Sequence, residues 1–492
     1  MACTIAAATT MGTMISCSSP APTKDEIAVQ KLDSLFTERY SPQPNPGGTV
    51  LIMKGDSVLY QNSWGIADTE LNTKIDANTF FNIASVSKQF TAVAIMKLHE
   101  EGKLDIYKSI YDVAPSVNKF LPKKAKPFSD IRVIDLMAHS SGIPDARPRS
   151  DRNFTLTATD MESLQYMKDL KELNFTPGTE YEYMNPTFQL LYVMIEAASG
   201  MPFEQYMREQ IFTPAGMEET LYFQADREIP RMAHGYVTED DNAPAETKQF
   251  RQYDYGEETF FATKADGGIY TSINEFVQWE KALRNNLFMS EKMTAEAHGP
   301  VTKITGSTFS DYQNRPNTSY GYGWFIEDNP GMPRKVYHTG DNGGFQIYAG
   351  RFPEKEVLML VFENRNDHSR WKMVEKLDII AKDKTVDFIK YGAPYGFIIN
   401  DGSIKIIEGN TLPLGILEEL SPSIAQAKVN DGDMILLITD GIADSFGSSS
   451  SIIDFLRSVP AKNPQTLSNQ VLSKAISLSQ GRRLDDMTAL AV

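Results

Sequence analysis

Ser85 and Lys88 are the two residues of this sequence whose types and spacing best suit covalent chemistry. They stand three positions apart in residues 81–88, FNIASVSK. Apolar residues then recur at helical spacing up to Gly102, so we expect a helix that begins near Ser85 and ends there. The first turns are apolar nearly all round, which is typical of a central, buried helix. Residues three apart lie on one helix face, so the hydroxyl and the amine can meet.

A serine and a lysine at the start of a helix can form a nucleophile and its base. The helix N-terminus offers unpaired N–H groups and positive potential, which stabilise negative charge on an attacked carbonyl oxygen. Burial and the same potential disfavour the charged form of Lys88, and a neutral lysine can take the proton of Ser85. A structural alternative fits the pair as well, because serine is a common N-cap and helical lysines are usually solvated.

Further segments of the chain favour the chemical interpretation. Residues 81–88 resemble the active-site segment of the penicillin-recognising serine enzymes, which include serine β-lactamases, penicillin-binding proteins and DD-peptidases. The second motif of that group, Tyr-x-Asn, appears as Tyr183-Met184-Asn185, and its strand motif, usually Lys-Thr-Gly, appears as His338-Thr339-Gly340. Two more stretches are typical of the class C branch, namely residues 136–144, LMAHSSGIP, and residues 267–272, GGIYTS. The resemblance covers about residues 30–380, with the motifs in the right order.

The resemblance implies a role for each matched residue. Ser85 would attack the acyl carbonyl, and Lys88 would be the general base or share the proton with Tyr183. Tyr183 would protonate the leaving group and later activate water. Asn185 would contact the substrate amide, and His338 and Thr339 would contact an anionic or polar part of the substrate. The main-chain N–H groups of Ser85 and of Asp341, just past Gly340, would form the oxyanion hole.

Each of these residues also has a purely structural interpretation. Tyr183 could be a packing tyrosine, Asn185 a turn residue before a proline, and His338 a satisfied strand histidine. His139, in the segment 136–144, better fits a structural role, since the Ser85 pair already supplies a base. An inactive protein on the same scaffold would bind cell-wall peptides, but the intact nucleophile, lysine and tyrosine argue against it.

The third motif departs from the usual pattern of the group. A lysine there gives a fixed positive charge for a carboxylate, whereas His338 is neutral much of the time near pH 7. His-Thr-Gly looks more like the esterases and D-aminopeptidases of the group. We therefore expect weak β-lactam hydrolysis. The expected reaction passes through an acyl-enzyme, needs no cofactor and acts on an ester, an amide or a D-amino-acid peptide. Peptidoglycan-type peptides are among the candidate substrates.

The C-terminal residues 385–492 resemble half of another enzyme family. Residues 412–415 (LPLG), 432–441 (GDMILLITDG) and 485–488 (DDMT) are similar to sporulation-type metal-dependent serine/threonine phosphatases. The resemblance implies that Asp440 and Asp485 would bind Mn²⁺ or Mg²⁺ for phosphoester hydrolysis. Alone, Asp-Gly after a strand is more often a hairpin turn. The family needs an earlier Asp-Gly segment with further carboxylates, and none between residues 383 and 432 fits, so we expect no phosphatase activity.

Strands at both ends of the first region must position the Ser85 site. Residues 48–53 and 57–63 are β-rich at one end, and 336–340, 345–352 and 356–364 at the other. We expect one sheet from both ends of this region, with helices between, and a helix from Pro186 to Gly200. The fold class is α+β, a β-lactamase/transpeptidase-like fold with an antiparallel sheet and a helical region. Residues 385–492 are expected to be short strands and turns, part of an α/β phosphatase-like sandwich.

Composition limits the partners of the chain. The formal net charge of −16 over 492 residues makes nucleic acid and anionic membrane surfaces poor partners. Both cysteines lie within the first 17 residues, so the folded body has no disulfide, and the six histidines show no zinc spacing. No run of 18 apolar residues predicts a membrane span.

The N-terminal residues look like an export signal. Residues 1–16 carry no charge, and residues 14–17, MISC, resemble a lipobox that would leave Cys17 as a lipidated first residue. The start lacks the usual positive charge, so a cytoplasmic chain with an irregular tail is the alternative. We expect three regions: a signal and tether over 1–29, the hydrolase over 30–382 and the phosphatase-like unit over 385–492. We expect the product to be extracytoplasmic, and the lipobox resemblance implies a lipid anchor at Cys17.

Overall fold

The computed structural model of this chain divides into two units, residues 1–377 and residues 378–492. The residues that it describes are 24–40, 45–122, 128–148, 150–151, 154, 157–223, 229, 231–238, 240, 243, 247–253, 263–304, 317–329, 333–366, 373–374, 377, 385–390, 395–400, 403–407, 423–428, 433–459, 463–479 and 487–491. The expected signal and lipobox over residues 1–23 lie outside this set, so export and lipidation stay predictions. Among the described residues, no helix combines the length and the apolar character needed to cross a membrane.

An eight-stranded antiparallel sheet forms the frame of the first unit. Its strand order is β10-β11-β12-β13-β14-β15-β1-β2. The strands are β1 (Gly48–Lys54), β2 (Ser57–Trp64), β10 (Thr302–Lys303), β11 (Thr318–Tyr320), β12 (Phe325–Glu327), β13 (Lys335–Asn342), β14 (Phe345–Phe352) and β15 (Val357–Glu363).

The sheet joins the two ends of the first unit, as the sequence predicts. Strand β1 pairs with β15 in antiparallel register from Gly48↔Glu363 to Lys54↔Val357. The predicted hairpin between β14 and β15 turns through η6 (Pro353–Lys355), a single 3₁₀ turn. The expectation of one sheet with helices inserted between its two halves is therefore confirmed.

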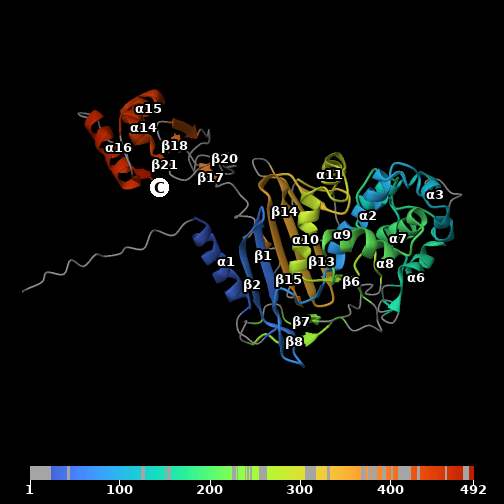
Figure 1. Cartoon of the computed structure of the whole chain (residues 1–492). Coiled ribbons are helices and arrows are strands. Elements are labelled where there is room, and N and C mark those ends of the chain that lie inside the picture. The colour runs from blue at the N-terminus through green and yellow to red at the C-terminus, as the bar shows by residue number, and fades with distance from the viewer. Residues whose placement is uncertain are drawn as a thin grey trace, which may run out of the picture. The chain divides into compact units, whose positions relative to one another are not determined.

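Helices cover both faces of this sheet. Helix α1 (Lys24–Tyr40) lies against one face, where Phe36 stacks on Tyr60 and Trp64 of β2. Helix α10 (Ile273–Arg284) lies on the opposite face, and its residues share a core with Leu51 of β1. Figure 1 shows the sheet between these two helices. The first unit is thus layered as helix, sheet and helix, with the larger core on the α10 face.

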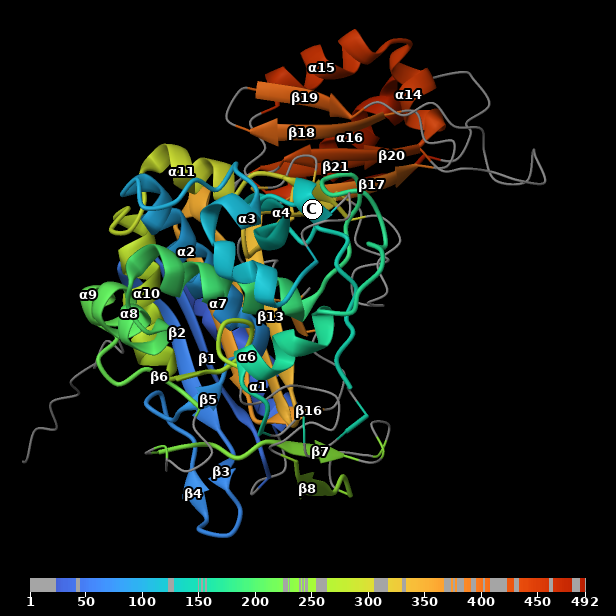
Figure 2. The same ribbon diagram turned by 90° about the vertical axis from the view of Figure 1, so that its right-hand side faces the viewer.

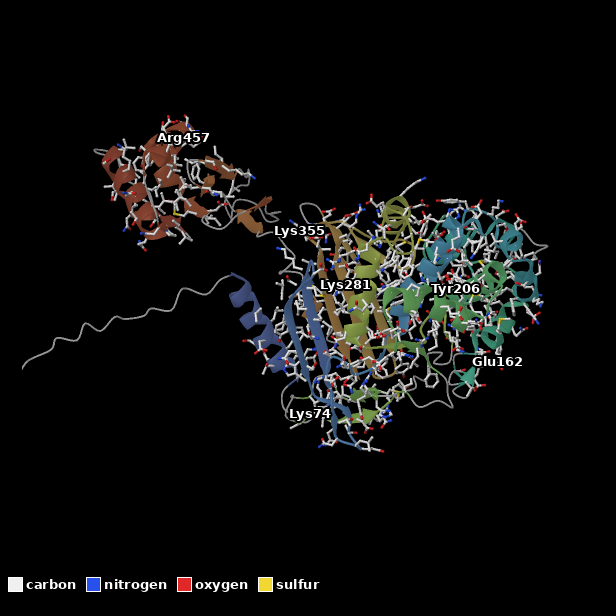
Figure 3. The ribbon with its side chains drawn as sticks, viewed as in Figure 1. Lys74, Glu162, Tyr206, Lys281, Lys355 and Arg457 are labelled. Atoms are coloured by element: carbon white, nitrogen blue, oxygen red, sulfur yellow. The ribbon has the colours of Figure 1, made fainter. Side chains whose placement is uncertain are left out.

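A helical region extends from the α10 face and surrounds α2 (Lys88–Glu100) (Figure 1). Ten of the thirteen residues of α2 are buried, which confirms a central helix. Tyr206, in the same core, is 1% exposed (Figure 3). The elements of this region are η1 (Ala84–Ser87), α3 (Ile110–Val113), η2 (Pro115–Lys119), η3 (Phe128–Asp130), α4 (Val133–Met137), α6 (Asp160–Leu164), η4 (Gln165–Met167), α7 (Asn185–Ser199), α8 (Phe203–Met207), the π-helical turn η5 (Arg208–Phe212), α9 (Thr213–Ala215) and α11 (Glu291–Ala297).

Small sheets connect these layers. One of them, β5-β9-β6, brings the residues just before Ser85 beside the GGIYTS segment. Figure 2 shows another, the β3–β4 hairpin, reaching away from the main sheet. These strands are β3 (Ile66–Asp68), β4 (Thr73–Lys74), β5 (Phe81–Asn82), β6 (Leu221–Tyr222), β7 (Tyr236–Thr238), β8 (Phe250–Gln252), β9 (Ile269–Thr271) and β16 (Arg365–Asn366).

The second unit contains helices that the sequence analysis did not predict. The expectation of short strands and turns over residues 385–492 is wrong for α14 (Asp440–Phe446), α15 (Ser449–Ser458) and α16 (Pro464–Leu478), which pack on the strands (Figure 2). Ser448 and Asn463 cap α15 and α16, and Leu467 and Val471 repeat at helical spacing into the core. The strands are β17 (Thr385–Lys390), β18 (Tyr395–Asn400), β19 (Ser403–Ile407), β20 (Ser423–Lys428), β21 (Met434–Ile438) and β22 (Ala489–Ala491), arranged as β19-β18-β21-β22 and β17-β20.

Candidate active site

Ser85 and Lys88 meet at the entry to the central helix. Ser85 lies in the 3₁₀ turn η1, and the α-helix itself begins at Lys88, three residues later than expected. The Nζ of Lys88 donates a hydrogen bond to the Oγ of Ser85 at 2.9 Å and another to the main-chain oxygen of Asp266 at 2.7 Å. Lys88 is fully buried. The structural alternative of a solvated lysine is therefore wrong.

The surroundings of Lys88 favour its neutral form. Burial is the main cause that lowers the pKa of Lys88 from 10.5 to about 7, with the Asp266 carboxylate acting in the opposite direction and Arg147 adding to the decrease. The positive charge of Arg147 is compensated in part by a bidentate ion pair with Asp145, at 2.7 Å for both contacts. A lysine with a pKa near 7 is neutral in a large fraction of molecules at physiological pH, so it can accept a proton.

The turn that carries Ser85 is held in an unusual backbone conformation. Ala84 has a φ of +45°, a region that residues with a side chain rarely adopt. The side chain of Asn82 holds this turn, because its Oδ1 accepts from the Ala84 N–H at 2.9 Å and from Asn342 Nδ2 at 3.3 Å. Asn82 is fully buried. Asn82 belongs to the motif of residues 81–88, but its role in holding the turn depends on contacts that no local pattern reveals.

Gly340 lets strand β13 approach the same turn. A Cβ at Gly340 would come within 2.3 Å of the main-chain oxygen of Ile83 and 3.1 Å of the Ala84 Cβ. The contact places the strand with the His-Thr-Gly motif directly against the turn that carries the nucleophile. The N–H groups proposed for the oxyanion hole, those of Ser85 and Asp341, therefore belong to segments that touch.

The segment before and within GGIYTS anchors the start of α2. Besides Asp266, which accepts from Lys88, Ala265 accepts from Thr91 Oγ1 at 2.7 Å through its main-chain oxygen. The N–H of Ile269 donates to Ser87 Oγ at 3.3 Å. These contacts explain why the GGIYTS segment lies beside the site, because they fix the position of the helix that carries Lys88.

Two buried carboxyl groups lie behind the lysine and were not identified from the sequence. Asp160 is buried and accepts from the N–H groups of Lys264 and Ala265. Burial first, and then the charge of Asp266, raise the pKa of Asp160 to about 7. Gln189 Nε2 donates to Asp266 at 3.3 Å. Nothing in the local sequence marks this cluster, since Asp160 and Asp266 are more than a hundred residues apart.

Tyr183 lies beside the amine of Lys88. The Nζ is 5.0 Å from the centre of the Tyr183 ring, on the face of the ring. Asn185, the first residue of α7, has a buried Oδ1 with no hydrogen-bond partner in the described part of the chain. A buried amide oxygen without a partner is uncommon in folded proteins. The structure thus brings the Tyr183 ring beside Lys88. A contact between Asn185 and a substrate amide stays a prediction.

Both ring nitrogens of His338 are occupied by the protein. Its Nε2 lies 2.8 Å from the hydroxyl of Tyr320, and its Nδ1 lies 2.6 Å from the main-chain oxygen of Thr339. Because a carbonyl oxygen only accepts, Nδ1 carries a proton, and in the neutral ring Nε2 accepts from Tyr320. The ring centres of His338 and Tyr183 are 6.1 Å apart, so this histidine belongs to the same site.

Thr339 and Asp341, the other two residues of strand β13 that were predicted to contact the substrate, differ in exposure. Thr339 is 3% exposed and pairs with Tyr348 of β14. Asp341 is exposed, and its Oδ1 accepts from Gln346 Nε2 at 3.3 Å. Their contacts with a substrate remain predictions.

Of the two metal ligands that the resemblance implies for the second unit, the structure describes only Asp440. Asp440 begins helix α14, and its Oδ1 accepts from the N–H of Gly441 at 3.1 Å, so the hairpin alternative for this Asp-Gly pair is wrong. Asp485 lies outside the described residues. Within the described ranges, no group of three or more histidine, cysteine or carboxylate residues could hold a metal ion. Metal binding by Asp440 and Asp485 is thus what the resemblance implies for a complete unit only, and the expected lack of phosphatase activity stays a prediction.

Comparisons with known proteins agree with this geometry. The family model "Beta-lactamase" matches residues 32–379, and the model "Stage II sporulation protein E (SpoIIE)" matches residues 372–492. The chain is 26% identical over 380 residues to penicillin-binding protein 4* of Bacillus subtilis, covering 74% of this chain and 76% of that protein.

Solved structures show the same fold for the first unit. A penicillin-binding protein from Bacillus halodurans superposes with a TM-score of 0.57 at 24% identity, covering 70% of this chain and 98% of that one. A D-amino acid amidase from Ochrobactrum anthropi SV3 superposes with a TM-score of 0.56 at 20% identity, covering 71% and 97%. The expected β-lactamase/transpeptidase-like fold is therefore confirmed.

Proposed function

This chain belongs to the beta-lactamase family, whose members are serine hydrolases, and from this premise we propose that it cleaves esters or amides through an acyl-enzyme on Ser85. The observation that carries the proposal is the 2.9 Å contact between a buried lysine amine and the Ser85 hydroxyl. In its neutral form the amine keeps one N–H for the Asp266 carbonyl and directs its lone pair toward the serine proton.

The proposed reaction has two halves. Ser85 Oγ attacks the acyl carbonyl while its proton passes to Lys88, and the N–H groups near Ser85 and Asp341 stabilise the oxyanion. Tyr183 then delivers a proton to the leaving alcohol or amine, and the acyl group stays on Ser85. In the second half, water attacks this ester as Tyr183 or Lys88 takes its proton. The bond between the acyl carbon and Ser85 Oγ then breaks, a proton returns to Oγ through Lys88, and the acid product leaves.

The environment of His338 supports a substrate without a carboxylate beside the scissile bond. A lysine at this position would offer a fixed charge, whereas both nitrogens of His338 are engaged by Tyr320 and by the main chain. Arg147, whose charge also acts on Lys88, already pairs with Asp145. We propose simple esters and D-amino-acid amides as better substrates than β-lactams or peptides with a free carboxylate.

Trapping the acyl-enzyme tests this proposal. After incubation with a fluorophosphonate, intact-mass and peptide mapping are expected to show one adduct on Ser85 in each molecule. Turnover is then compared for p-nitrophenyl butyrate, D-alanine p-nitroanilide and nitrocefin, and we expect the ester and the amide to exceed nitrocefin. A folded protein that takes up no adduct would instead support the inactive, peptide-binding alternative.

The pH dependence provides a second test. Because the neutral form of Lys88 accepts the proton, kcat/KM for an uncharged ester should fall about tenfold per pH unit below a pKa of about 7 and level off above it. With an ordinary lysine, this fall in kcat/KM would already begin above pH 9. The Asp160→Asn variant is the matched control, since Asp160 also titrates near pH 7, and the limb should persist in it. A flat profile between pH 5 and 8 would contradict the role of Lys88.

A further inference from the structure

His139 is a buried histidine beneath the tyrosine of the site. It follows helix α4, is fully buried, and has a φ of +52°. Its ring centre lies 4.2 Å from the ring centre of Tyr183, with 37° between the planes. Packed aromatic rings at this distance restrict each other's rotation. The conformation of Tyr183 therefore depends on where His139 is held.

Both the side chain and the main chain of His139 bind the segment that carries Tyr183. The N–H of Met184 donates to His139 Nδ1 at 3.2 Å, and the N–H of Glu182 donates to the His139 main-chain oxygen at 3.0 Å. These bonds hold the residue before Tyr183 and the residue after it. Thr187 Oγ1, which donates to the Met184 oxygen at 2.7 Å, is also 3.3 Å from Nδ1.

These contacts determine the protonation state of His139. Since Nδ1 accepts from Met184, the neutral ring carries its proton on Nε2, which has no hydrogen-bond partner among the described residues. Burial, followed by the charges of Lys88 and His338, holds the pKa of His139 well below its usual value. The specific polar contacts of the ring are thus made through Nδ1, and they are directed at the Tyr183 segment.

We propose that His139 is a positioning residue that accepts the Met184 N–H and thereby holds the Tyr183 ring beside the Lys88 amine. The catalytic part of this proposal rests on the proposed function, because Tyr183 matters there as the acid for the leaving group. Losing the acceptor would leave the partly buried N–H of Met184 without this bond, and the 182–185 segment would shift to pair it elsewhere. A shift of about 1 Å in a catalytic group can cost about 100-fold in rate.

Two variants of nearly equal shape separate positioning from packing. His139→Asn keeps an acceptor near the place of Nδ1 and tolerates a positive φ, whereas His139→Leu has a similar branched shape without the acceptor. Thermal unfolding of both variants shows whether each is folded at the assay temperature. Hydrogen exchange of a peptide that contains Met184 then reports the bond directly, without reference to activity.

We expect exchange at Met184 to be faster in His139→Leu than in the native protein and nearly unchanged in His139→Asn. For an alkyl ester, whose leaving group needs a proton, His139→Leu should lower kcat about 100-fold with little change in KM. For a p-nitrophenyl ester, whose leaving group needs none, the loss should stay below about tenfold. In a Tyr183→Phe background, His139→Leu should add no more than about threefold.

The outcomes distinguish this inference from the proposed function. Equal losses on both esters, or unchanged exchange at Met184 in His139→Leu, would overturn the positioning role. If the native protein shows no Ser85-dependent turnover while Met184 exchange rises in His139→Leu, the proposed function fails and the structural role of His139 stands.

Discussion

Replacing Ser85 by alanine is expected to abolish adduct formation and to lower kcat by about 10⁴-fold or more for every ester and amide that the protein cleaves. The expectation follows from the position of its hydroxyl, which accepts from Lys88 at 2.9 Å. Without this oxygen no acyl-enzyme can form, and the remaining groups offer only oxyanion stabilisation and binding. Steady-state hydrolysis of p-nitrophenyl butyrate, together with intact-mass analysis, measures both effects.

Ser87→Ala is the matched control for this prediction. Ser87 lies in the same 3₁₀ turn, but its Oγ accepts from the Ile269 N–H, whereas Lys88 donates to Ser85. Its removal should cost stability, while labelling of Ser85 persists. If Ser85→Ala keeps a tenth of the native rate, or if label appears on another serine, the assignment of the nucleophile is wrong.

Replacing Lys88 by methionine should lower kcat/KM by about 10²–10⁴-fold, the usual contribution of a general base. Methionine fills a similar volume, and it removes an amine that burial already disfavours in its charged form. The melting temperature should therefore fall little or rise, even as activity is lost. The combination of lost activity and retained stability is the diagnostic result.

Lys88→Arg identifies which property of the lysine matters. Arginine keeps a positive charge and hydrogen-bond donors, but its very high pKa prevents it from releasing a proton at the pH of the assay. If Lys88 acts as the base, the arginine variant should be as impaired as the methionine variant. Near-native activity of Lys88→Arg would show that a positive charge beside Ser85 is sufficient, and the general-base role would be wrong.

The second unit shows where sequence patterns give an incomplete account. The capped helices α15 and α16 have clear N-terminal signals at Ser448 and Asn463, and a strict test of helical spacing would have predicted them. Asp440 is the first residue of a helix, which neither a hairpin nor a ligand interpretation anticipated.

The sequence by itself determined the elements and the reactive pair of the first unit. β-rich composition predicted β1, β2, β13, β14 and β15. Helical spacing predicted α2, and a proline start with a glycine stop predicted α7, because all of these signals lie in neighbouring residues of the chain. The meeting of Ser85 with Lys88 also follows from local geometry, since one turn of helix or 3₁₀ turn brings such residues together.

Only the tertiary structure decided the position of Ser85 and Lys88 and the pKa of the lysine. The Asp266 carbonyl that binds Lys88 is 178 residues away, Asn342 reaches Asn82 across 260 residues, and His139 holds a segment 45 residues further on. No local period encodes such contacts. They arise when the sheet closes β1 onto β15 and α2 becomes buried, and burial is also what lowers the pKa of Lys88.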